Sequence, residues 1–279
     1  MTGYYNSREV VENYIAGCRA KAQTSSVKLI LKAVMAGMMI AMGAGISSVA
    51  AHSVGNVGLA RLAAAVVFPM GLMMVILLGT ELFTGDCLFV MSVFDRKQTV
   101  WQYTRLLCLV YIGNFIGAGL LALLISMSGQ WDYSSGMLGA YTIKVAVGKV
   151  NVSFVEGIVS GVLCNILVCA AVLMAMCAKD VAGRLFASFF VIMLFVTGGF
   201  EHCVANMYYI TAGLIAKTDP VYSALSMEAY GYSEAYLGTL NIANFLIKNL
   251  LPVTIGNIVG GAFCLGAPMY YLNREKKKD

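Results

Sequence analysis

The sequence is poor in charged residues, proline, histidine and tryptophan. Charged side chains make up 12% of the 279 residues, whereas an ordinary soluble domain carries about 25%. So few charges cannot cover a water-facing surface, which excludes a cytosolic enzyme and a soluble nucleic-acid-binding module. The net charge of +5 does not indicate nucleic-acid binding either, because the basic residues fall in short clusters between apolar runs.

Cysteine is more frequent, with eight residues, but no pair has the CxxC spacing of a zinc or redox site. Most of these cysteines lie inside apolar segments, so we interpret them as packing residues rather than as disulfides of a secreted domain. A bis-histidine haem needs two histidines that face one another at one depth. His52 ends one apolar run and His202 lies in the middle of another, so we expect no cofactor and no metal.

Long apolar runs dominate the chain. Hydrophobic residues make up 59% of it, and a helix needs about 20 apolar residues to cross a bilayer. Six such runs predict an all-α membrane protein with six transmembrane helices and leave no room for a second, soluble domain. The runs cover approximately 29–51, 62–94, 103–127, 154–178, 185–216 and 245–272.

Lysine and arginine are distributed unevenly around these runs. Fourteen of the nineteen lie before or at the start of the first run, after the second and fourth runs or at the C-terminus. Because positive residues favour the cytoplasmic side, we expect both termini in the cytoplasm and the protein in the inner (plasma) membrane. We divide the chain into a cytoplasmic N-terminal segment (1–28), a six-span channel domain (29–273) and a basic cytoplasmic tail (274–279).

The N-terminal segment lacks the basic start and short apolar core of a cleaved signal peptide, so we expect it to be retained. Its apolar residues recur at helical spacing and predict an amphipathic helix at the inner membrane interface, with a solvated helix as the alternative. These residues are Val10, Val11, Tyr14, Ile15 and Cys18.

Two of the six runs contain polar residues at membrane depth. The second includes GTELFTGD (79–86), and the fifth includes GGFEHCVAN (198–206). A charged residue at the centre of a straight transmembrane helix costs about 2.5 to 3.5 kcal/mol. Irregular backbone is tolerated at that depth only where protein buries it or water lines a cavity. We therefore predict that the second and fifth transmembrane helices are interrupted halfway and face an interior path.

The same features also indicate an internal repeat. Each interruption has a glycine followed, two residues later, by a glutamate, Glu81 or Glu201, and a GN motif follows each in the next run, GNFIGAG (113–119) and GNIVGGA (256–262). Three spans thus repeat as three spans, which inverts the second copy, as in several transporters. Close helix packing by small residues explains the GN motifs alone, but not the matched glutamates. We expect each glutamate to support its interruption, by capping exposed amides or by pairing with a cation.

At these motifs the sequence resembles the formate/nitrite transporter family. The resemblance rests on ELFTG (81–85), FEHCVANM (200–207) and NLLPVTIGNIVGG (249–261), and it extends over essentially the whole chain. Within the family, the GDC that ends the first interruption is most similar to hydrosulfide-conducting members. The resemblance implies an aquaporin-like fold and a homopentamer with one pore in each protomer. Aquaporins themselves are disfavoured because no proline lies in an Asn-Pro-Ala motif.

The resemblance also implies roles for individual residues. Thr84 and His202 correspond to the pore centre, and Lys149 to an anion-attracting lysine with Asn165 and Asn257 as its amide partners. The apolar constrictions correspond to Phe68, Leu72, Leu82, Phe83 and Phe195. Without the resemblance, we would interpret His202 and the apolar residues as packing residues. Lys149 would be an interfacial lysine whose charge reaches water.

These residues predict a channel for small monovalent weak-acid anions such as hydrosulfide, formate and nitrite. An apolar constriction opposes a bare ion strongly, whereas the neutral acid crosses at little cost. We therefore expect the anion to be drawn in by Lys149 and protonated in the pore near Thr84 and His202. Whether the imidazole donates a proton or only hydrogen-bonds is left open. A proton-coupled anion symporter of the same fold is the alternative.

Overall fold

The computed structural model describes residues 3–274, and its secondary structure is helical. Within those residues the only extended pairing is an isolated bridge between Tyr4 and Ala178. Six helices are long and apolar enough to cross a membrane, as predicted. Three of them are the continuous helices α2 (Ser26–Ala51), α7 (Val100–Met127) and α9 (Phe154–Cys177).

The second span is interrupted in the way the sequence predicts. It begins as α3 (Val57–Val67) and α4 (Met70–Leu78), and Gly79 ends α4 in the left-handed region, with a φ of 62°. That conformation has little steric cost only for glycine. After an extended stretch the chain resumes helical geometry. This second half consists of α5 (Phe83–Asp86), η1 (Cys87–Phe89) and α6 (Val90–Phe94).

The fifth span repeats this construction. Helix α10 (Val181–Gly198) ends at Gly199, which has a φ of 68°, and helix α11 (Cys203–Ala216) follows an extended stretch. Both predicted interruptions are therefore confirmed.

The sixth span contains irregularities that the sequence analysis did not predict. It runs through α14 (Ile242–Asn244), the π-helical η3 (Phe245–Leu250), α15 (Leu251–Ile258), the π-helical η4 (Val259–Gly266) and α16 (Ala267–Asn273). Pro252 and Pro268 each follow a π-helical turn closely. A proline cannot donate the regular backbone hydrogen bond, and the wider turn before it accommodates the loss.

Shorter helices lie outside the spans. Helix α1 (Ser7–Gln23) begins with a capping box formed by Asn6 and Glu9, and the apolar face predicted for it is buried. Helix α8 (Met137–Val150) precedes α9, with η2 (Gln130–Asp132) before it. Helices α12 (Pro220–Tyr230) and α13 (Glu234–Gly238) connect the fifth and sixth spans. Helices α8, α12 and α13 were not predicted from the sequence.

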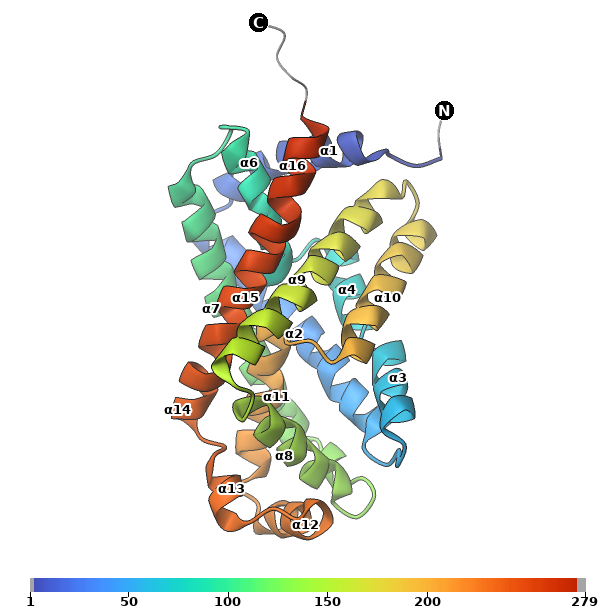
Figure 1. The fold of residues 1–279 in the computed structure, drawn as a ribbon, viewed down its shortest axis with the longest axis vertical. Coiled ribbons are helices and arrows are strands. Elements are labelled where there is room, and N and C mark those ends of the chain that lie inside the picture. The colour runs from blue at the N-terminus through green and yellow to red at the C-terminus, as the bar shows by residue number, and fades with distance from the viewer. Residues whose placement is uncertain (1–2, 275–279) are drawn as a thin grey trace, which may run out of the picture.

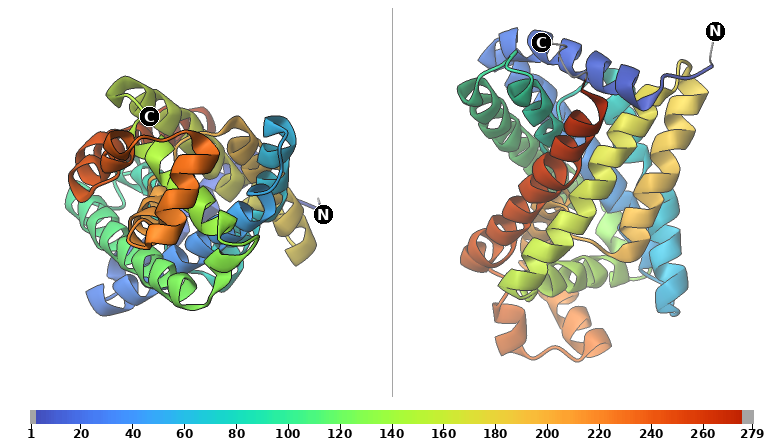
Figure 2. Two further views of the ribbon diagram at one scale, coloured as in Figure 1. Left: turned by 90° about the horizontal axis from the view of Figure 1, so that it is seen from below. Right: turned by 45° about the horizontal axis from the view of Figure 1, so that its top comes forward.

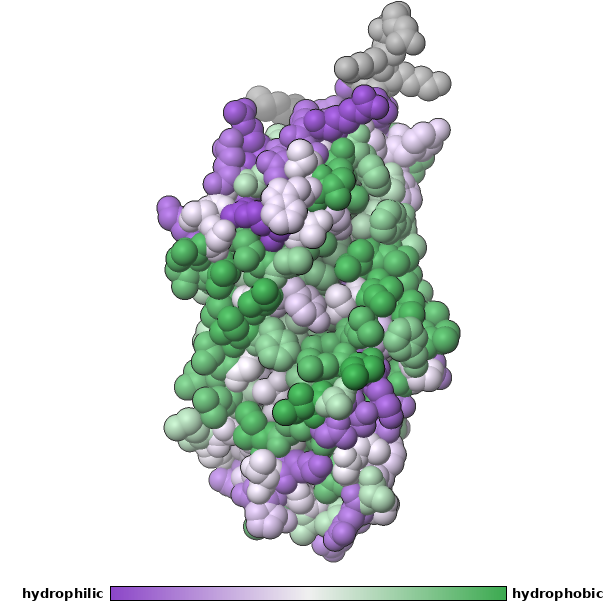
Figure 3. Space-filling model, turned by 90° about the vertical axis from the view of Figure 1, so that its left-hand side faces the viewer, coloured by the Kyte–Doolittle hydropathy of each residue, from purple (hydrophilic) through white to green (hydrophobic). Residues whose placement is uncertain are grey.

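The two halves of the chain enter from opposite ends of the molecule. Helices α1 and α16 lie at one end together with both termini, whereas α8, α12 and α13 lie towards the other (Figure 1). Figure 2 shows the same arrangement from two further directions. Each half runs in the order short helix, span, interrupted span and span, so the repeat is inverted as predicted. On the face that Figure 3 shows, apolar residues form a broad band across the middle of the molecule, between two polar ends.

The glycines of the GN motifs allow the spans within each half to pack closely. A Cβ atom on Gly117 would collide with the carbonyl oxygen of Val34, in α2. A Cβ atom on Gly260 would collide in the same way with Val162, in α9. Small residues that let backbones approach are typical of membrane helix interfaces. These glycines therefore have the packing role, while the asparagine beside each motif's first glycine has another.

Candidate functional site

The two interruptions are held by equivalent asparagines. The Asn114 side chain, in α7, accepts a hydrogen bond from Phe83 N at 2.9 Å and donates to Ala33 O and Glu81 O at 2.7 and 3.0 Å. Asn257, in α15, accepts from Cys203 N at 2.9 Å and donates to Gly161 O and Glu201 O at 2.8 and 3.0 Å. Each asparagine thus satisfies two backbone groups of an interruption and ties them to a carbonyl oxygen of the neighbouring helix, α2 or α9.

Thr84 and His202 meet where the two interruptions approach one another. The Thr84 hydroxyl lies 3.0 Å from His202 Nε2, and both residues are buried. His202 Nδ1 accepts a hydrogen bond from Ala205 N at 3.0 Å, which caps α11. Because Nδ1 is an acceptor, the neutral ring carries its proton on Nε2 and donates it to Thr84. The hydroxyl hydrogen of Thr84 then points to any further acceptor.

A vestibule opens toward each end of the molecule. The α1 vestibule, of about 280 Å³, is lined by Lys21, Leu72, Glu81, Leu82 and Asp86 among others. The α8 vestibule, of about 750 Å³, is lined by residues that include Phe68, Lys149, Phe195, Glu201 and His202.

The structure places four of the five predicted constriction residues along these vestibules. Phe68 and Phe195 meet edge to face in the α8 vestibule, with ring centroids 5.4 Å apart. Phe195 also lies 5.8 Å from the His202 ring. Leu72 and Leu82 are buried in the lining of the α1 vestibule.

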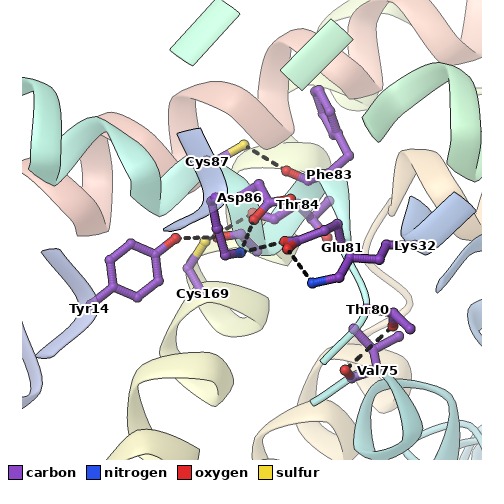
Figure 4. Close-up of polar contacts among 12 residues, drawn as sticks. Tyr14, Lys32, Val75, Thr80, Glu81, Phe83, Thr84, Asp86, Cys87 and Cys169 are labelled. Atoms are coloured by element: carbon purple, nitrogen blue, oxygen red, sulfur yellow. Dashed lines mark hydrogen bonds and ion pairs between the residues drawn. The ribbon is translucent and has the colours of Figure 1, made fainter. Parts of the chain in front are cut away.

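Phe83 does not share this position. Its ring packs edge-on against Tyr111 at a centroid distance of 4.9 Å and lines neither vestibule. Figure 4 shows the ring pointing away from the Glu81 and Asp86 carboxylates. The reason is the geometry of the chain at the interruption, where Leu82 is extended and Phe83 begins α5. Adjacent residues with these backbone conformations direct their side chains to different sides.

In the α8 vestibule, Lys149 pairs with Glu201. The ammonium lies 2.9 Å from Glu201 Oε1, and Glu201 Oε2 accepts a hydrogen bond of 2.6 Å from Asn206. Asn249 donates to the Lys149 carbonyl oxygen and lies 3.4 Å from Glu201 Oε2. The ammonium also lies over the Tyr209 ring, 5.4 Å from its centroid.

The expectation that Asn165 and Asn257 bind the Lys149 ammonium is wrong. Asn165 donates to the backbone oxygens of Thr84 and Asn257, at 3.1 and 2.6 Å, and Asn257 holds the second interruption. The backbone oxygens of Thr84, Asn257, Gly161 and Glu201 take both amides instead, because polar groups inside a membrane must find their partners within the protein. A carboxylate, Glu201, pairs with the lysine instead.

The α1 vestibule contains a second cluster in which a lysine pairs with a glutamate (Figure 4). Lys21, from α1, lies 2.6 Å from Glu81 Oε2 and 2.5 Å from Asp86 Oδ1. Lys32 lies 3.6 Å from Glu81 Oε1, and the Tyr14 hydroxyl donates to Gly85 O at 3.4 Å. Burial alone would lower the pKa of Lys21, but the two carboxylates raise it above its usual value. The ammonium therefore stays charged.

Lys21 and Lys149 are equivalent in the inverted repeat. Each lies five residues before the helix that opens its half, α2 or α9. Each pairs with the glutamate that lies two residues after a left-handed glycine. Lys21 could not be identified from the sequence, because it lies eight residues before the first apolar run (29–51), whereas Lys149 lies five residues before the fourth (154–178). Both glutamates pair with lysines, which was one of the two roles expected of them.

The described residues offer no ready metal site. Residues 3–274 contain no group of three or more His, Cys, Asp and Glu that could hold an ion. Five of the eight cysteines are buried and all eight are free thiols, in agreement with their interpretation as packing residues. Cys108 and Cys264 are exposed.

Comparisons with known proteins agree with this geometry. The sequence model of the formate/nitrite transporter family matches residues 8–271. The formate channel FocA of Haemophilus influenzae is 38% identical, over 78% of this chain and 76% of that protein. The formate-nitrite transporter of Plasmodium falciparum is 32% identical, over 92% of this chain and 81% of that protein.

Two solved structures share the fold. One, described as a pentameric formate channel with formate bound, has 29% sequence identity and a TM-score of 0.78. The match covers 88% of this chain and 97% of that one. The other, described as an ion channel of the FNT family, has 24% identity and a TM-score of 0.78, over 95% of this chain and 99% of that one.

Proposed function

Because this chain belongs to the formate/nitrite transporter family, we propose that it is a channel for small monovalent anions of weak acids. It is a multi-pass membrane protein, and the relatives compared with it are channels and transporters rather than enzymes. Formate is the substrate best supported, because several relatives are formate channels. Nitrite and hydrosulfide have the same charge and a similar size, and we include them in the proposed range.

The observation that carries the proposal is the buried Thr84–His202 contact, together with the apolar residues in the linings of the two vestibules, Leu72, Leu82, Phe68 and Phe195. Transfer of an unpaired ion from water to such a region costs many kcal/mol of free energy, whereas transfer of a neutral acid costs little. The passage therefore suits a solute that exists both as an anion and as its neutral conjugate acid. A sugar or a strong-acid anion has no comparable route.

Each vestibule supplies an ammonium at the start of this route. Lys149 in the α8 vestibule and Lys21 in the α1 vestibule attract an anion from the adjoining water. Their glutamate partners keep them in place and moderate the attraction, so that the anion does not bind too tightly to leave. As the anion moves toward the apolar residues its charge becomes more costly, and it takes up a proton.

Thr84 and His202 hydrogen-bond the neutral acid at the centre. His202 Nε2–H donates to Thr84 Oγ1, and the Thr84 hydroxyl hydrogen is directed to the permeating molecule. Full protonation of His202 would turn Nδ1 into a donor and break its hydrogen bond with Ala205 N. We therefore assign His202 the role of orienting the Thr84 hydroxyl, and the proton reaches the anion before the centre.

We further propose that the protein is a homopentamer in the inner membrane with both termini in the cytoplasm. A pentameric formate channel of the same fold supports the assembly. The excess of lysine and arginine on the α1 side supports the orientation. The boundaries 1–28, 29–273 and 274–279 follow from the same assignment, and most of the tail, 275–279, lies outside the described residues.

Flux measurements on purified protein in liposomes test this function. We expect the wild type to pass formate, nitrite and hydrosulfide, and Thr84→Val and His202→Ala to lower these fluxes about tenfold. Tenfold corresponds to about 1.4 kcal/mol, in the range for a hydrogen bond to a buried polar group. Thr197→Val is the matched control, since Thr197 is exposed on α10 and bonds only its own helix. Glycerol flux equal to anion flux in the wild type would contradict the proposal.

The constriction has its own test. Phe195→Ala removes the ring that packs on Phe68 and His202, and we expect it to let glycerol pass at a rate at least about tenfold above the wild type. The reason is that neutral solutes of this size are excluded mainly by the width of the pore. Phe190→Ala, on the exposed face of the same helix, is the control. Equal glycerol leakage in the two variants would show that Phe195 does not close the pore.

A further inference from the structure

The two vestibules differ at one position of the inverted repeat. Asp86 lies five residues after Glu81, and Asn206 lies five residues after Glu201. In the α8 vestibule Lys149 pairs with one carboxylate, and Asn206 donates to that carboxylate. In the α1 vestibule Lys21 pairs with two carboxylates. The repeat therefore shows where this half of the protein carries a carboxyl group that the shared architecture does not require.

The two carboxylates are close and almost fully buried. Glu81 and Asp86 each place an oxygen against the same Lys21 nitrogen, so these oxygens lie within about 5 Å of one another. Their side chains are only 4% and 1% exposed. Glu81 Oε1 faces Lys32, but Asp86 Oδ2 is buried without a hydrogen-bond partner. Two carboxylates in such a position cannot both ionise at low cost, and one proton shared between them relieves the repulsion.

Among the titratable groups of the α1 vestibule, the Glu81–Asp86 pair is the one best suited to exchange a proton. The charged neighbours are cations, namely Lys21 of α1, Lys32 of α2 and Arg184 of α10. The other titratable side chains nearby are phenols and thiols, which are neutral acids: Tyr14, Cys18, Cys87, Tyr103 and Cys169. A carboxyl group loses its proton far more readily than a phenol or a thiol.

We propose that Glu81 and Asp86 hold one proton between them and exchange it with the permeating weak acid in the α1 vestibule. This inference rests on the proposed function. When an anion arrives, the O–H bond of the carboxyl pair breaks and the proton forms a new bond to the anion, which becomes the neutral acid. The electron pair stays on the carboxylate oxygen, beside Lys21, and water at the mouth of the vestibule returns a proton. Solute that moves the other way reverses each step.

The position of the pair fits this role. Glu81 and Asp86 line the same vestibule as Leu72 and Leu82, so the proton is exchanged just before the apolar part of the route. His202 cannot supply the proton there without losing its bond to Ala205. The α8 vestibule, with Asn206 in place of a second carboxyl, has no equivalent pair, and exchange on that side involves water.

The test uses the repeat itself. Asp86→Asn installs the residue that the second half carries at this position, so the fold is expected to tolerate it. We measure formate flux as a function of pH and expect the flux of this variant to be about tenfold below that of the wild type at the high-pH end. A tenfold loss is small compared with the usual effect of removing a positioned proton donor. Its flux is also expected to depend less on pH than that of the wild type. Asp95→Asn is the matched control, because Asp95 pairs with Lys97 outside the vestibule.

A second measurement does not depend on transport. Infrared spectra of the wild type at neutral pH are expected to show a buried protonated carboxyl band that is absent from Asp86→Asn and present in Asp95→Asn. If the band is present in the wild type and absent from Asp86→Asn, but the wild type passes no anion, the shared proton is supported and the proposed function is refuted. The inference would be overturned if formate flux through Asp86→Asn depended on pH as it does in the wild type, whatever its absolute rate. Absence of the carboxyl band from the wild type would also overturn it.

Discussion

Lys149→Glu is expected to lower formate flux in liposomes about a hundredfold while leaving assembly intact. The ammonium lies 2.9 Å from Glu201 in the lining of the α8 vestibule. Reversing its charge places two carboxylates where an anion must enter. A unit charge at about 4 Å contributes about 4 kcal/mol at the effective dielectric constant typical of protein surfaces, so a hundredfold loss is a moderate expectation.

The control for this variant is Lys248→Glu, which reverses an exposed lysine outside both vestibules. Its flux is expected to stay within about twofold of the wild type, because exposed charges are well screened by salt. Lys149→Gln is expected to lie between the two. Wild-type flux in a correctly assembled Lys149→Glu protein would refute the attracting role of the lysine.

Asn257→Ala is expected to prevent stable folding. The amide satisfies Cys203 N, Gly161 O and Glu201 O, all of them buried within the fold. Each backbone group left without a partner costs about 1 to 3 kcal/mol, and more within a bilayer. The sum is comparable with the stability of a whole domain. Gel filtration and thermal unfolding in detergent measure the effect.

The inverted repeat extends this prediction. Asn114→Ala removes the equivalent three hydrogen bonds and is expected to cost as much. Asn241→Ala, at the exposed start of α14, removes a helix cap and a solvent-exposed hydrogen bond to Gly238 O, and it is expected to cost about 1 kcal/mol. If Asn257→Ala unfolds at the same temperature as Asn241→Ala, the asparagine does not hold the interruption.

The spans and their interruptions could be predicted because local chemistry determines them. A run of apolar residues has few alternatives to a membrane helix, and a glutamate two residues after a glycine at membrane depth has few alternatives to an interruption. The amphipathic face of α1 was also readable, from the spacing of residues such as Val10 and Tyr14. Helix α8 was missed because its 14 residues are too few to span a bilayer and include two lysines.

Contacts between distant segments could not be predicted in the same way. Lys21 meets Glu81 only because α1 packs back against the bundle, and nothing near either residue specifies that packing. The amides of Asn165 and Asn257 were assigned to a lysine because sequence shows which residues can hydrogen-bond but not which acceptor lies closest. Phe83 was assigned to the constriction together with Leu82 from the resemblance to the family, and the turn between the two residues separates their side chains.

The pairing of a lysine with a glutamate at both entrances has a consequence for the physiology of the cell. A solute that enters from either side meets a lysine paired with a glutamate, although only the α1 side adds a second carboxyl group. A passage with no coupled source of energy favours neither direction. Net movement follows the concentrations and acidities that metabolism maintains on the two faces.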